Sequence, residues 1–468
     1  MNRVSALALA VSAGWAIPAH ASAASDAAIQ QELAAMRAQM QQMASRIDSL
    51  EGQLVDARAV AAAAETRAIA ASAAVAGIPA QVTQAASATA KPATEITWDG
   101  APRLSTRDGW SFKPRGRLQI DVAGVDGPAG IAQARSLGFA SRVRRARLGV
   151  DGTVPGGFGY RVEADFGNSD VALTDVYMTY KASPSLTLMV GHQKIFLGLE
   201  EQGSNLFLSF MERAAFNGAF NNERRLGLSA QYTGKLVVLQ GGVFTDGAVE
   251  LNSDANNSWS IDGRIVAMPK IGSAQLHFAA SAHYNEFNDA ATSVRYRVRP
   301  FVRTTDVRFV DTGAISATGE RRFGAELAYI NGRFHAMAES QWITAMRPGL
   351  QDPTFNGGYA EVGYLLTDDT VGYKAGIFDR IKPRKPLGAG GIGAVQVNLR
   401  YDWLSLNSGA IIGGRQQVAA ASLIWVPVSH VRFILNYGHL WLNDAAVPAG
   451  AARDYTANAL GLRAQFDF

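Results

Sequence analysis

The chain contains no cysteine among its 468 residues. This absence excludes disulfides, thiolate metal ligands and cysteine nucleophiles, and it suits an exported chain that avoids oxidative mispairing. The sequence also lacks an internal run of about 20 apolar residues, which excludes a membrane-spanning helix in the mature chain. This criterion does not detect strands that cross a membrane, because only alternate residues in such strands are apolar.

Blocks of like charge and motifs of catalysis are missing as well. The formal net charge is +4, and the basic residues occur singly along strands, which argues against nucleic-acid binding. The seven histidines show no His-x-x-x-His or His-Glu-x-x-His spacing, so no metal site is expected. No spacing ties Ser, His and Asp together, and no Gly-rich phosphate loop leads from a strand into a helix. We therefore expect neither an enzyme nor a bound cofactor.

The amino terminus has the pattern of a cleaved signal peptide over residues 1–23. A short positive segment, Met1–Arg3, precedes an apolar core at Val4–Ile17. Small residues suited to cleavage follow at Ala19-His20-Ala21 or Ala21-Ser22-Ala23. A membrane anchor is the alternative, but the apolar run is too short to span a bilayer. The pattern predicts export from the cytoplasm.

Residues 24–76 show the hydrophobic periodicity of a helix. Apolar residues recur in steps of four and three, which is the a/d seam of a coiled coil, and a coiled coil needs partner helices. The seam residues are Ile29, Leu33, Met36, Met40, Met43, Ile47, Leu50 and Leu54, followed by Ala57, Ala61, Ala64, Ala68, Ala71 and Val75. The alternative is a single Ala-rich helix held by propensity alone. Residues 77–97, rich in Ala, Ser, Thr, Gln and Pro, are predicted to be a linker.

From about Phe112 the period becomes two and remains so to the end of the chain. In the final segment, Leu460, Leu462 and Phe466 alternate with polar residues, and the chain stops on the aromatic Phe468. About sixteen such segments follow one another, and an even number of segments of roughly ten residues is what a closed outer-membrane barrel requires. The predicted strands lie near 116–122, 142–150, 158–166, 174–180, 186–190, 224–233, 236–244, 258–268, 274–285, 319–330, 333–343, 358–366, 394–404, 416–426, 430–441 and 456–468.

The connections support this fold class, because short and long ones alternate. Barrels of this kind have short periplasmic turns and longer outer loops. The connections predicted to be long are 195–223, 245–257, 286–318, 344–357, 367–393 and 442–455. We therefore predict an all-β transmembrane protein: a sixteen-stranded antiparallel outer-membrane β-barrel over residues 98–468, preceded by an N-terminal α-helical coiled coil.

Arginine dominates the polar face of the first strands, which a closed barrel turns toward its lumen. The positions are Arg117, Arg145, Arg147 and Arg161, while Arg142 and Arg144 are out of phase and suggest a bulge or a rim. Guanidinium groups stay charged and offer forked donors to phosphate or carboxylate, so a column of them favours anions. The alternative is a balanced lattice in which they pair with acidic residues such as Glu163, Asp165, Asp175, Glu326, Glu339 and Asp402.

The third outer connection, within 193–225, is apolar enough to be buried. We expect it to fold into the barrel and narrow it, so that its charged residues set selectivity. These residues are Glu200, Glu201, Glu212 and Arg213.

Several motifs at these places resemble the phosphate-selective porin O and P family over roughly residues 96–468. The matching stretches include Arg144–Gly152, Tyr160–Phe166, Phe210–Arg213 and Ile381-Lys382-Pro383. The resemblance implies a sixteen-stranded trimeric anion channel. It also implies a narrow zone formed by Arg144, Arg145, Ser204 and Arg213, with Asp175 beside it.

One departure from the family concerns the third loop, where phosphate-selective members carry lysine. This chain has Glu200-Glu201-Gln202-Gly203-Ser204-Asn205-Leu206 at that place, and carboxylates raise the energy of a dianion. Glu201 is therefore expected to act against phosphate in the constriction.

Together these features predict a porin in the outer membrane of a Gram-negative bacterium, in contact with lipid and assembled as a homotrimer. We expect passive diffusion of small hydrophilic solutes with a preference for phosphate or other small anions. The alternatives are a weakly selective general porin, or a structural tether to peptidoglycan or another periplasmic contact through the coiled coil.

Overall fold

The structure is a computed structural model. It describes residues 94–131, 137–167, 171–220, 224–248, 258–288 and 293–468, together with nine separate positions between Gln41 and Thr66. The chain divides into two units, Met1–Lys91 and Pro92–Phe468. In the described part of the chain, no helix is long and apolar enough to cross a membrane.

The first unit is described only at those nine positions, all of which are helical and exposed. The predicted signal peptide and every seam residue of the predicted coiled coil lie outside the described residues. The coiled coil therefore remains a prediction. Residues 94–97, which we assigned to the linker, belong to the first strand of the second unit, β1 (Thr94–Asp99).

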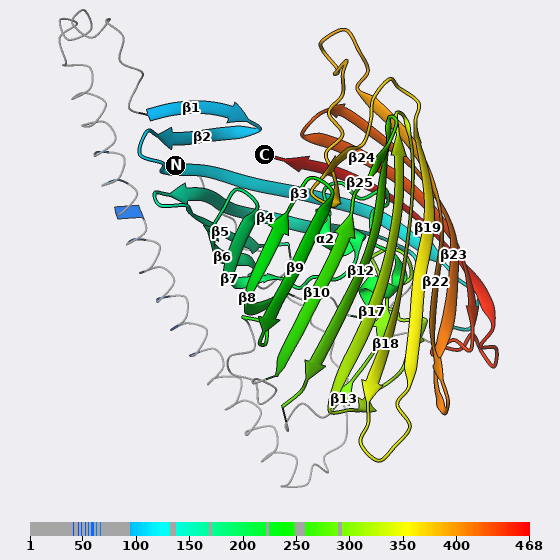
Figure 1. The fold of residues 1–468 in the computed structure, drawn as a ribbon. Helices are drawn as coiled ribbons and strands as arrows, with labels where there is room; N and C mark the ends of the chain where they lie inside the picture. Colours follow the sequence, from blue (N-terminus) through cyan, green and yellow to red (C-terminus); the bar gives the residue numbers. More distant parts are fainter. Residues whose placement is uncertain are drawn as a thin grey trace, which may run out of the picture. The chain divides into compact units, whose positions relative to one another are not determined.

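The second unit contains a closed antiparallel barrel (Figure 1). Of the nineteen strands in its sheet, β1, β2 (Ala101–Thr106) and β11 (Lys270–Ile271) are accessory, and the other sixteen form the wall. Closure occurs where β25 pairs with β3, from Asn458 opposite Asp126 to Asp467 opposite Arg117. The wall strands are β3 (Ser111–Asp126), β4 (Phe139–Val154), β5 (Phe158–Asp165), β6 (Ala172–Lys181), β7 (Leu186–Lys194), β8 (Arg224–Thr233), β9 (Val237–Phe244), β10 (Trp259–Ala267), β12 (Ala274–Glu286), β17 (Gly319–Asn331), β18 (Phe334–Met346), β19 (Thr354–Leu365), β22 (Ala394–Ser408), β23 (Ile411–Val428), β24 (Val431–Asn443) and β25 (Tyr455–Asp467). The predicted fold and strand number are confirmed.

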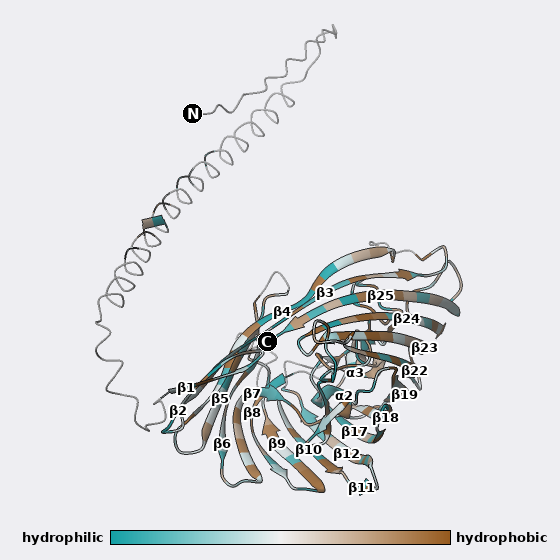
Figure 2. Cartoon of the chain, turned by 90° about the horizontal axis from the view of Figure 1, so that it is seen from above, coloured by the Kyte–Doolittle hydropathy of each residue, from teal (hydrophilic) through white to brown (hydrophobic). Residues whose placement is uncertain are grey.

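The two faces of the wall follow the period-two pattern, visible as alternating hydropathy along the strands in Figure 2. On β25, Leu460 and Leu462 are exposed, whereas Arg463, which follows Leu462, and Asp467 further along are buried. The apolar face therefore points outward and the polar face inward, as lipid on one side and a lumen on the other require. At the carboxyl end, the ring of Phe468 lies so close to Gly116 that a Cβ there would meet it at 2.4 Å.

One expectation about the connections is wrong. Residues 367–393 join β19 to β22 at the end of the barrel that carries the short turns and both ends of the sheet, which is the periplasmic end. At the other end, β22 and β23 are joined by only Gly409 and Ala410, where a long loop would continue the rhythm. The length of a connection depends on what the segment packs against as well as on its side of the membrane. This long periplasmic turn packs inside the barrel.

Among the residues that the structure describes, those of three connections occupy the lumen. We call them loop 3 (195–223), loop 5 (287–318) and turn 6 (366–393). Loop 3 carries the short helices α2 (Leu199–Gln202) and α3 (Ala215–Ala219). Loop 5 carries β13 (Ser293–Val294), β14 (Arg297–Val298), β15 (Val310–Asp311) and β16 (Ile315–Ser316), and turn 6 carries β20 (Gly372–Lys374) and β21 (Ile377–Asp379).

Loops 3 and 5 build an apolar core inside the barrel. Phe216 of loop 3, Tyr296 and Phe309 of loop 5, and Phe355 and Tyr359 of the wall are all buried in one cluster. Turn 6 packs Phe378 against this cluster. It is also held by Tyr373, whose hydroxyl lies 2.7 Å from Nδ1 of His277, and by Arg264, which donates to the carbonyl of Gly376 at 3.2 Å. The expectation that the third outer connection folds into the barrel is confirmed.

Phe216→Ala should loosen loop 3, because the ring is fully buried and stacks with Tyr359 at a centroid distance of 6.3 Å. Truncating a buried Phe to Ala costs about 3–5 kcal/mol. We expect larger and noisier single-channel currents and faster proteolysis within loop 3, measured in reconstituted protein. Phe139→Ala is the matched control, because Phe139 is 78% exposed on the outer face. Equal behaviour of the two variants would contradict this account of the core.

Candidate functional site

The inner wall formed by β3 to β9 faces a cavity of about 270 Å³ that loop 3 and turn 6 complete. Its charged lining consists of five cations and one acid: Arg115, Arg117, Arg161, Lys194, Arg224 and Asp175. The uncharged lining consists of Tyr177, Met189, Gln193, Phe196, Gln202, Ser204, Asn205, Gln231, Gln240 and Ile377. The wall strands thus bring three of the predicted pore residues, Arg117, Arg161 and Asp175, to one cavity with the loop residue Ser204.

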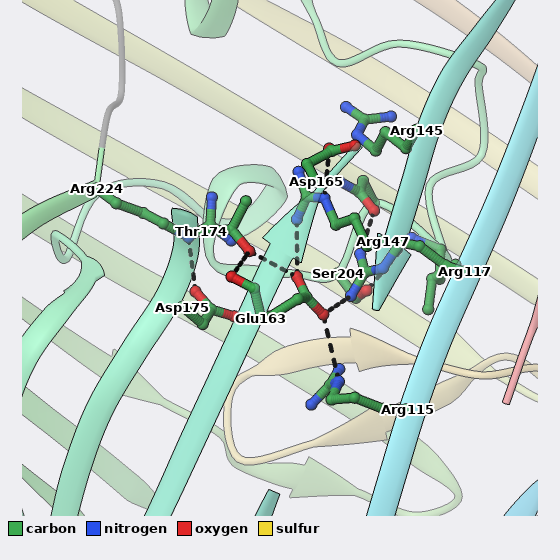
Figure 3. A network of polar contacts seen from close by, with 12 residues as sticks. Arg115, Arg117, Arg145, Arg147, Glu163, Asp165, Thr174, Asp175, Ser204 and Arg224 are labelled. Carbon is green, nitrogen blue, oxygen red and sulfur yellow. Dashed lines mark hydrogen bonds and ion pairs between the residues drawn. The ribbon is translucent and has the colours of Figure 1, made fainter. Parts of the chain in front are cut away.

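Glu163 is the centre of the charge network beside this cavity (Figure 3). One of its carboxylate oxygens lies 3.1 Å from Nη2 of Arg117 and 3.3 Å from Nε of Arg115. The other oxygen accepts from Arg147 at 3.0 Å and from the hydroxyl of Thr174 at the same distance. A single carboxylate therefore serves three guanidinium groups. Asp165 offsets part of this excess, since it accepts from Nε of Arg147 at 2.7 Å.

Arg161 is the least neutralised arginine of this cavity. Its nearest carboxylates, Asp151 and Asp175, are each 3.9 Å away, and its Nε has no hydrogen-bond partner among the described residues. Asp175 lies closer to Arg224, at 2.6 Å, so its charge is largely engaged there. The Arg161 guanidinium lies 5.6 Å from the centre of the Tyr177 ring. The Arg161 side chain is 31% exposed.

The predicted irregularity at Arg142–Arg144 is a β-bulge. Gln119 of β3 pairs with Arg145 and Ile120 pairs with Val143, so Arg144 is the extra residue. The bulge turns Arg144 toward loop 3, where it donates to both oxygens of Glu212 at 2.7 and 3.0 Å. Arg144 is therefore an anchor of loop 3.

Arg145 differs from its neighbour because it contacts no carboxylate within 4 Å among the described residues. Its Nη1 donates to the side-chain oxygen of Gln119 at 2.8 Å. The side chain is only 6% exposed and does not line the 270 Å³ cavity. Arg145 therefore adds positive charge to the wall next to Arg147, and no direct ion pair offsets this charge.

Two predicted pore residues of loop 3 lie elsewhere. The carboxylate of Glu201 is buried within the loop, 3.2 Å from Arg213 and 3.9 Å from Lys194. Arg213 also donates to the carbonyls of Glu200 and Gly203, and neither Glu201 nor Arg213 lines the cavity. The pair braces the loop internally, because two long side chains of opposite charge neutralise each other once both leave water. Glu201 consequently does not line this cavity, although we expected it in the constriction.

Carboxylates of the opposite wall hold loop 3 in place. Glu339 of β18 accepts hydrogen bonds from the backbone N–H groups of Leu199 and Glu200, at the start of α2. Asp402 of β22 accepts from Ala215 at the start of α3, and Asn436 of β24 accepts from Met211. Glu339 and Asp402 thus satisfy N–H groups that a short helix leaves unpaired at its start. The amide of Asn436 instead holds the segment between the two helices.

The lumen is therefore divided into two unlike halves. In the half occupied by loop 3, Arg400 is paired with Glu361 and Glu200 at 2.6 Å, whereas Arg432 donates to the backbone carbonyls of Leu206 and Leu208. The balanced lattice that we considered describes this half. Toward β3–β9, arginines outnumber the acids that contact them.

Our sequence reasoning missed a group of arginines in loop 5, because we treated that segment only as a long connection. Its arginines are Arg295, Arg297, Arg299, Arg303 and Arg308. The sequence signal for this group was an alternation of apolar residues and arginines. Tyr296 and Val298 are buried in the core, whereas Arg295 and Arg297, which precede them, are exposed. Lys194 and Arg224, at the ends of β7 and β8, were also overlooked as lining residues.

Loop 5 also contacts the bulge. Nε of Arg303 lies 3.4 Å from Glu212, and Arg142 donates to the carbonyl of Arg303 at 3.1 Å. The loop 5 arginines therefore approach the arginine-rich start of β4, which connects the outer part of the lumen with the wall around the cavity. No group of His, Asp and Glu that could hold a metal ion occurs within the described ranges.

Comparison with known proteins gives both sequence relatives and a similar fold. An uncharacterized protein of Caulobacter vibrioides is 44% identical over 459 residues, covering 94% of this chain and 90% of the relative. The in vitro folded outer-membrane protein OmpT of Vibrio cholerae has a TM-score of 0.50 at 12% identity, covering 80% of this chain and all of that one. An anion-selective porin from Comamonas acidovorans has a TM-score of 0.48 at 14% identity, covering 76% of this chain and all of the other.

The model of one protein family matches residues 112–468, which is nearly the whole barrel. The matched region contains every strand of the wall except the first residue of β3, together with loops 3 and 5 and turn 6. The chain belongs to the phosphate-selective porin O and P family of outer-membrane proteins.

Proposed function

We propose that this outer-membrane porin conducts small hydrophilic solutes passively and prefers anions. The observation that carries the proposal is the charge of the cavity lining, in which five cations face one acid. Unit charges about 4 Å apart interact by about 1 kcal/mol in water and about 4 kcal/mol near a protein surface. An uncompensated guanidinium therefore changes the relative concentrations of anion and cation in the lumen appreciably.

The proposed route begins at the loop 5 arginines and continues along the bulge in β4 to the cavity. Arg299 and Arg308 are partly exposed, and Arg299 is paired with Asp306 at 2.8 Å, so Arg308 in particular can attract anions before any water is removed. Arg117 and Arg161 then offer several N–H donors without leaving the wall. A series of weak cationic sites is suited to conduction, because a solute must be able to leave each site.

We propose a homotrimer surrounded by lipid as the working assembly, with the predicted coiled coil joining the three chains in the periplasm. Two alternatives remain distinct from an anion channel. A weakly selective general porin would show equal permeability to chloride and potassium. A structural tether, holding peptidoglycan through the coiled coil, need not conduct at all.

Arg161→Ala should reduce the preference for chloride over potassium, because it removes the arginine with the weakest ion pairs. A loss of about 1 kcal/mol in the water-filled lumen corresponds to roughly a fivefold fall in the permeability ratio. The measurement is the reversal potential of the reconstituted channel in a salt gradient.

Arg321→Ala is the matched control for this change. Arg321 lies on β17 with its side chain half exposed, next to the buried Arg322 and facing the other way. It should leave the ratio unchanged. An unchanged ratio in Arg161→Ala as well would mean that permeating ions do not meet this side chain.

The second test concerns phosphate. We expect millimolar phosphate to block chloride current only weakly in the native channel, because no lysine of loop 3 reaches the cavity. Ser204→Lys should strengthen the block by roughly fivefold, since it adds a cation worth about 1 kcal/mol or more to the cavity wall.

Glu201→Lys is the informative comparison, although it alters the charge by two units. It replaces the partner of Arg213 and Lys194 with a third cation inside loop 3. We expect increased conductance from a loosened loop and no stronger phosphate block. A strong block in Glu201→Lys, or a micromolar block in the native channel, would contradict the placement of these residues.

A further inference from the structure

A two-stranded hairpin, β1 and β2, precedes the barrel and is attached to its periplasmic rim (Figure 1). β2 pairs with the start of β3 through Leu104 opposite Phe112 and Ser105 opposite Ser111. At the other end of the hairpin, Gly100 packs against the imidazole of His430, where a Cβ would come within 2.4 Å of the ring. Gly100 has a φ of 74°, which favours glycine, so both the conformation and the close contact restrict this position.

One face of the hairpin is apolar and strongly exposed. Cross-strand pairing places Ile96 opposite Leu104 and Trp98 opposite Pro102. The exposed fractions are 65% for Ile96, 74% for Trp98, 39% for Leu104 and 42% for Phe112. Because Leu104 pairs with Phe112, and Phe112 shares its face of β3 with Leu118 and Ile120, this surface continues the outer face of the barrel.

The opposite face of the hairpin is polar and continues the inner face of the wall. The ammonium of Lys113 on β3 donates to the carbonyl of Asp99 at 2.7 Å and lies 3.6 Å from its carboxylate. This neighbour lowers the pKa of Asp99. Arg103 of β2 lies 3.6 Å from Asp151 on β4. The contacts fix which side of the hairpin faces outward.

We propose that the apolar face of the β1–β2 hairpin is a membrane-interface anchor, which rests on the headgroup and upper acyl region of the periplasmic leaflet. The partner is lipid because the face is continuous with the lipid-facing surface through Phe112. Neighbouring strands carry aromatic residues toward the same rim, where the rings of Phe466 and Phe468 pack in a tilted arrangement and Trp425 stacks on Phe433. Tryptophan in particular prefers the membrane–water interface.

The anchor has a consequence for the chain as a whole. Residues 94–106 join the barrel to the segment that precedes it, so a hairpin held at the membrane surface fixes where that segment leaves the barrel. This role is separate from conduction, and it does not depend on which ions the lumen prefers.

Single-cysteine labelling tests the proposal cleanly, because the native chain has no cysteine. Ile96→Cys and Trp98→Cys carry a spin label on the apolar face, and Glu95→Cys and Thr97→Cys carry it on the polar face of the same strand. The full-length protein is reconstituted in phosphatidylethanolamine–phosphatidylglycerol vesicles. Collision rates with oxygen, which concentrates in lipid, and with a water-soluble nickel chelate are then compared at each position.

Labels at 96 and 98 should collide at least fivefold more often with oxygen, relative to nickel, than labels at 95 and 97. Equal nickel accessibility at all four positions would overturn the proposal, because the apolar face would then be in water. Labels at 96 and 98 that are shielded from both reagents and broadened by nearby spins would overturn it too, since a second copy of the chain would cover the face. Native channel conductance in each variant confirms that the barrel has folded.

Discussion

Every other feature of this protein depends on the closure of the sheet between β3 and β25. A strand edge facing hydrocarbon would leave backbone N–H and C=O groups without partners, at a cost of several kcal/mol for each group. Closure removes the edge, and it also turns one face of every strand inward. The arginines that alternate with Leu118 and Leu148 are carried into the lumen by this constraint alone. The bulge adds Arg144, which is out of phase with this alternation, and brings it to loop 3.

The lumen contains a charged cavity because the inward-folded connections fill it unevenly. Loops 3 and 5 bring an apolar core into a space that the polar inner face would otherwise leave to water. Glu339, Asp402 and Asn436 pair the backbone of loop 3 with the wall on one side. On the other side the loop contacts the wall through Asn205, which accepts from Arg117, and through Glu212, which accepts from Arg144. The cavity that remains between the loop and β3–β9 takes its charge from the wall. The same loop thus narrows the passage and selects which half of the barrel lines it.

Much of the fold was predictable from the sequence. A hydrophobic period of two indicates which face of the sheet each residue occupies. The sixteen strands, the inward loop 3 and the irregular position of Arg144 were predicted on that basis. The pattern says nothing about which acid an arginine meets across the lumen. Glu201 was expected in the passage, yet Arg213 and Lys194 hold it within loop 3. Turn 6 was assigned to the wrong side because length alone does not show that a segment packs inside the barrel. The arginines of loop 5 were overlooked although their alternation was visible.

We propose that permeating ions pass through the cationic half of the lumen. The most direct test is the reversal potential of the native full-length channel in a planar bilayer separating tenfold different concentrations of potassium chloride. An anion path predicts a potential with the sign of the chloride gradient, which shrinks as ionic strength rises and the fixed charges are screened. A potential near zero, or one with the sign of potassium, would contradict the claim.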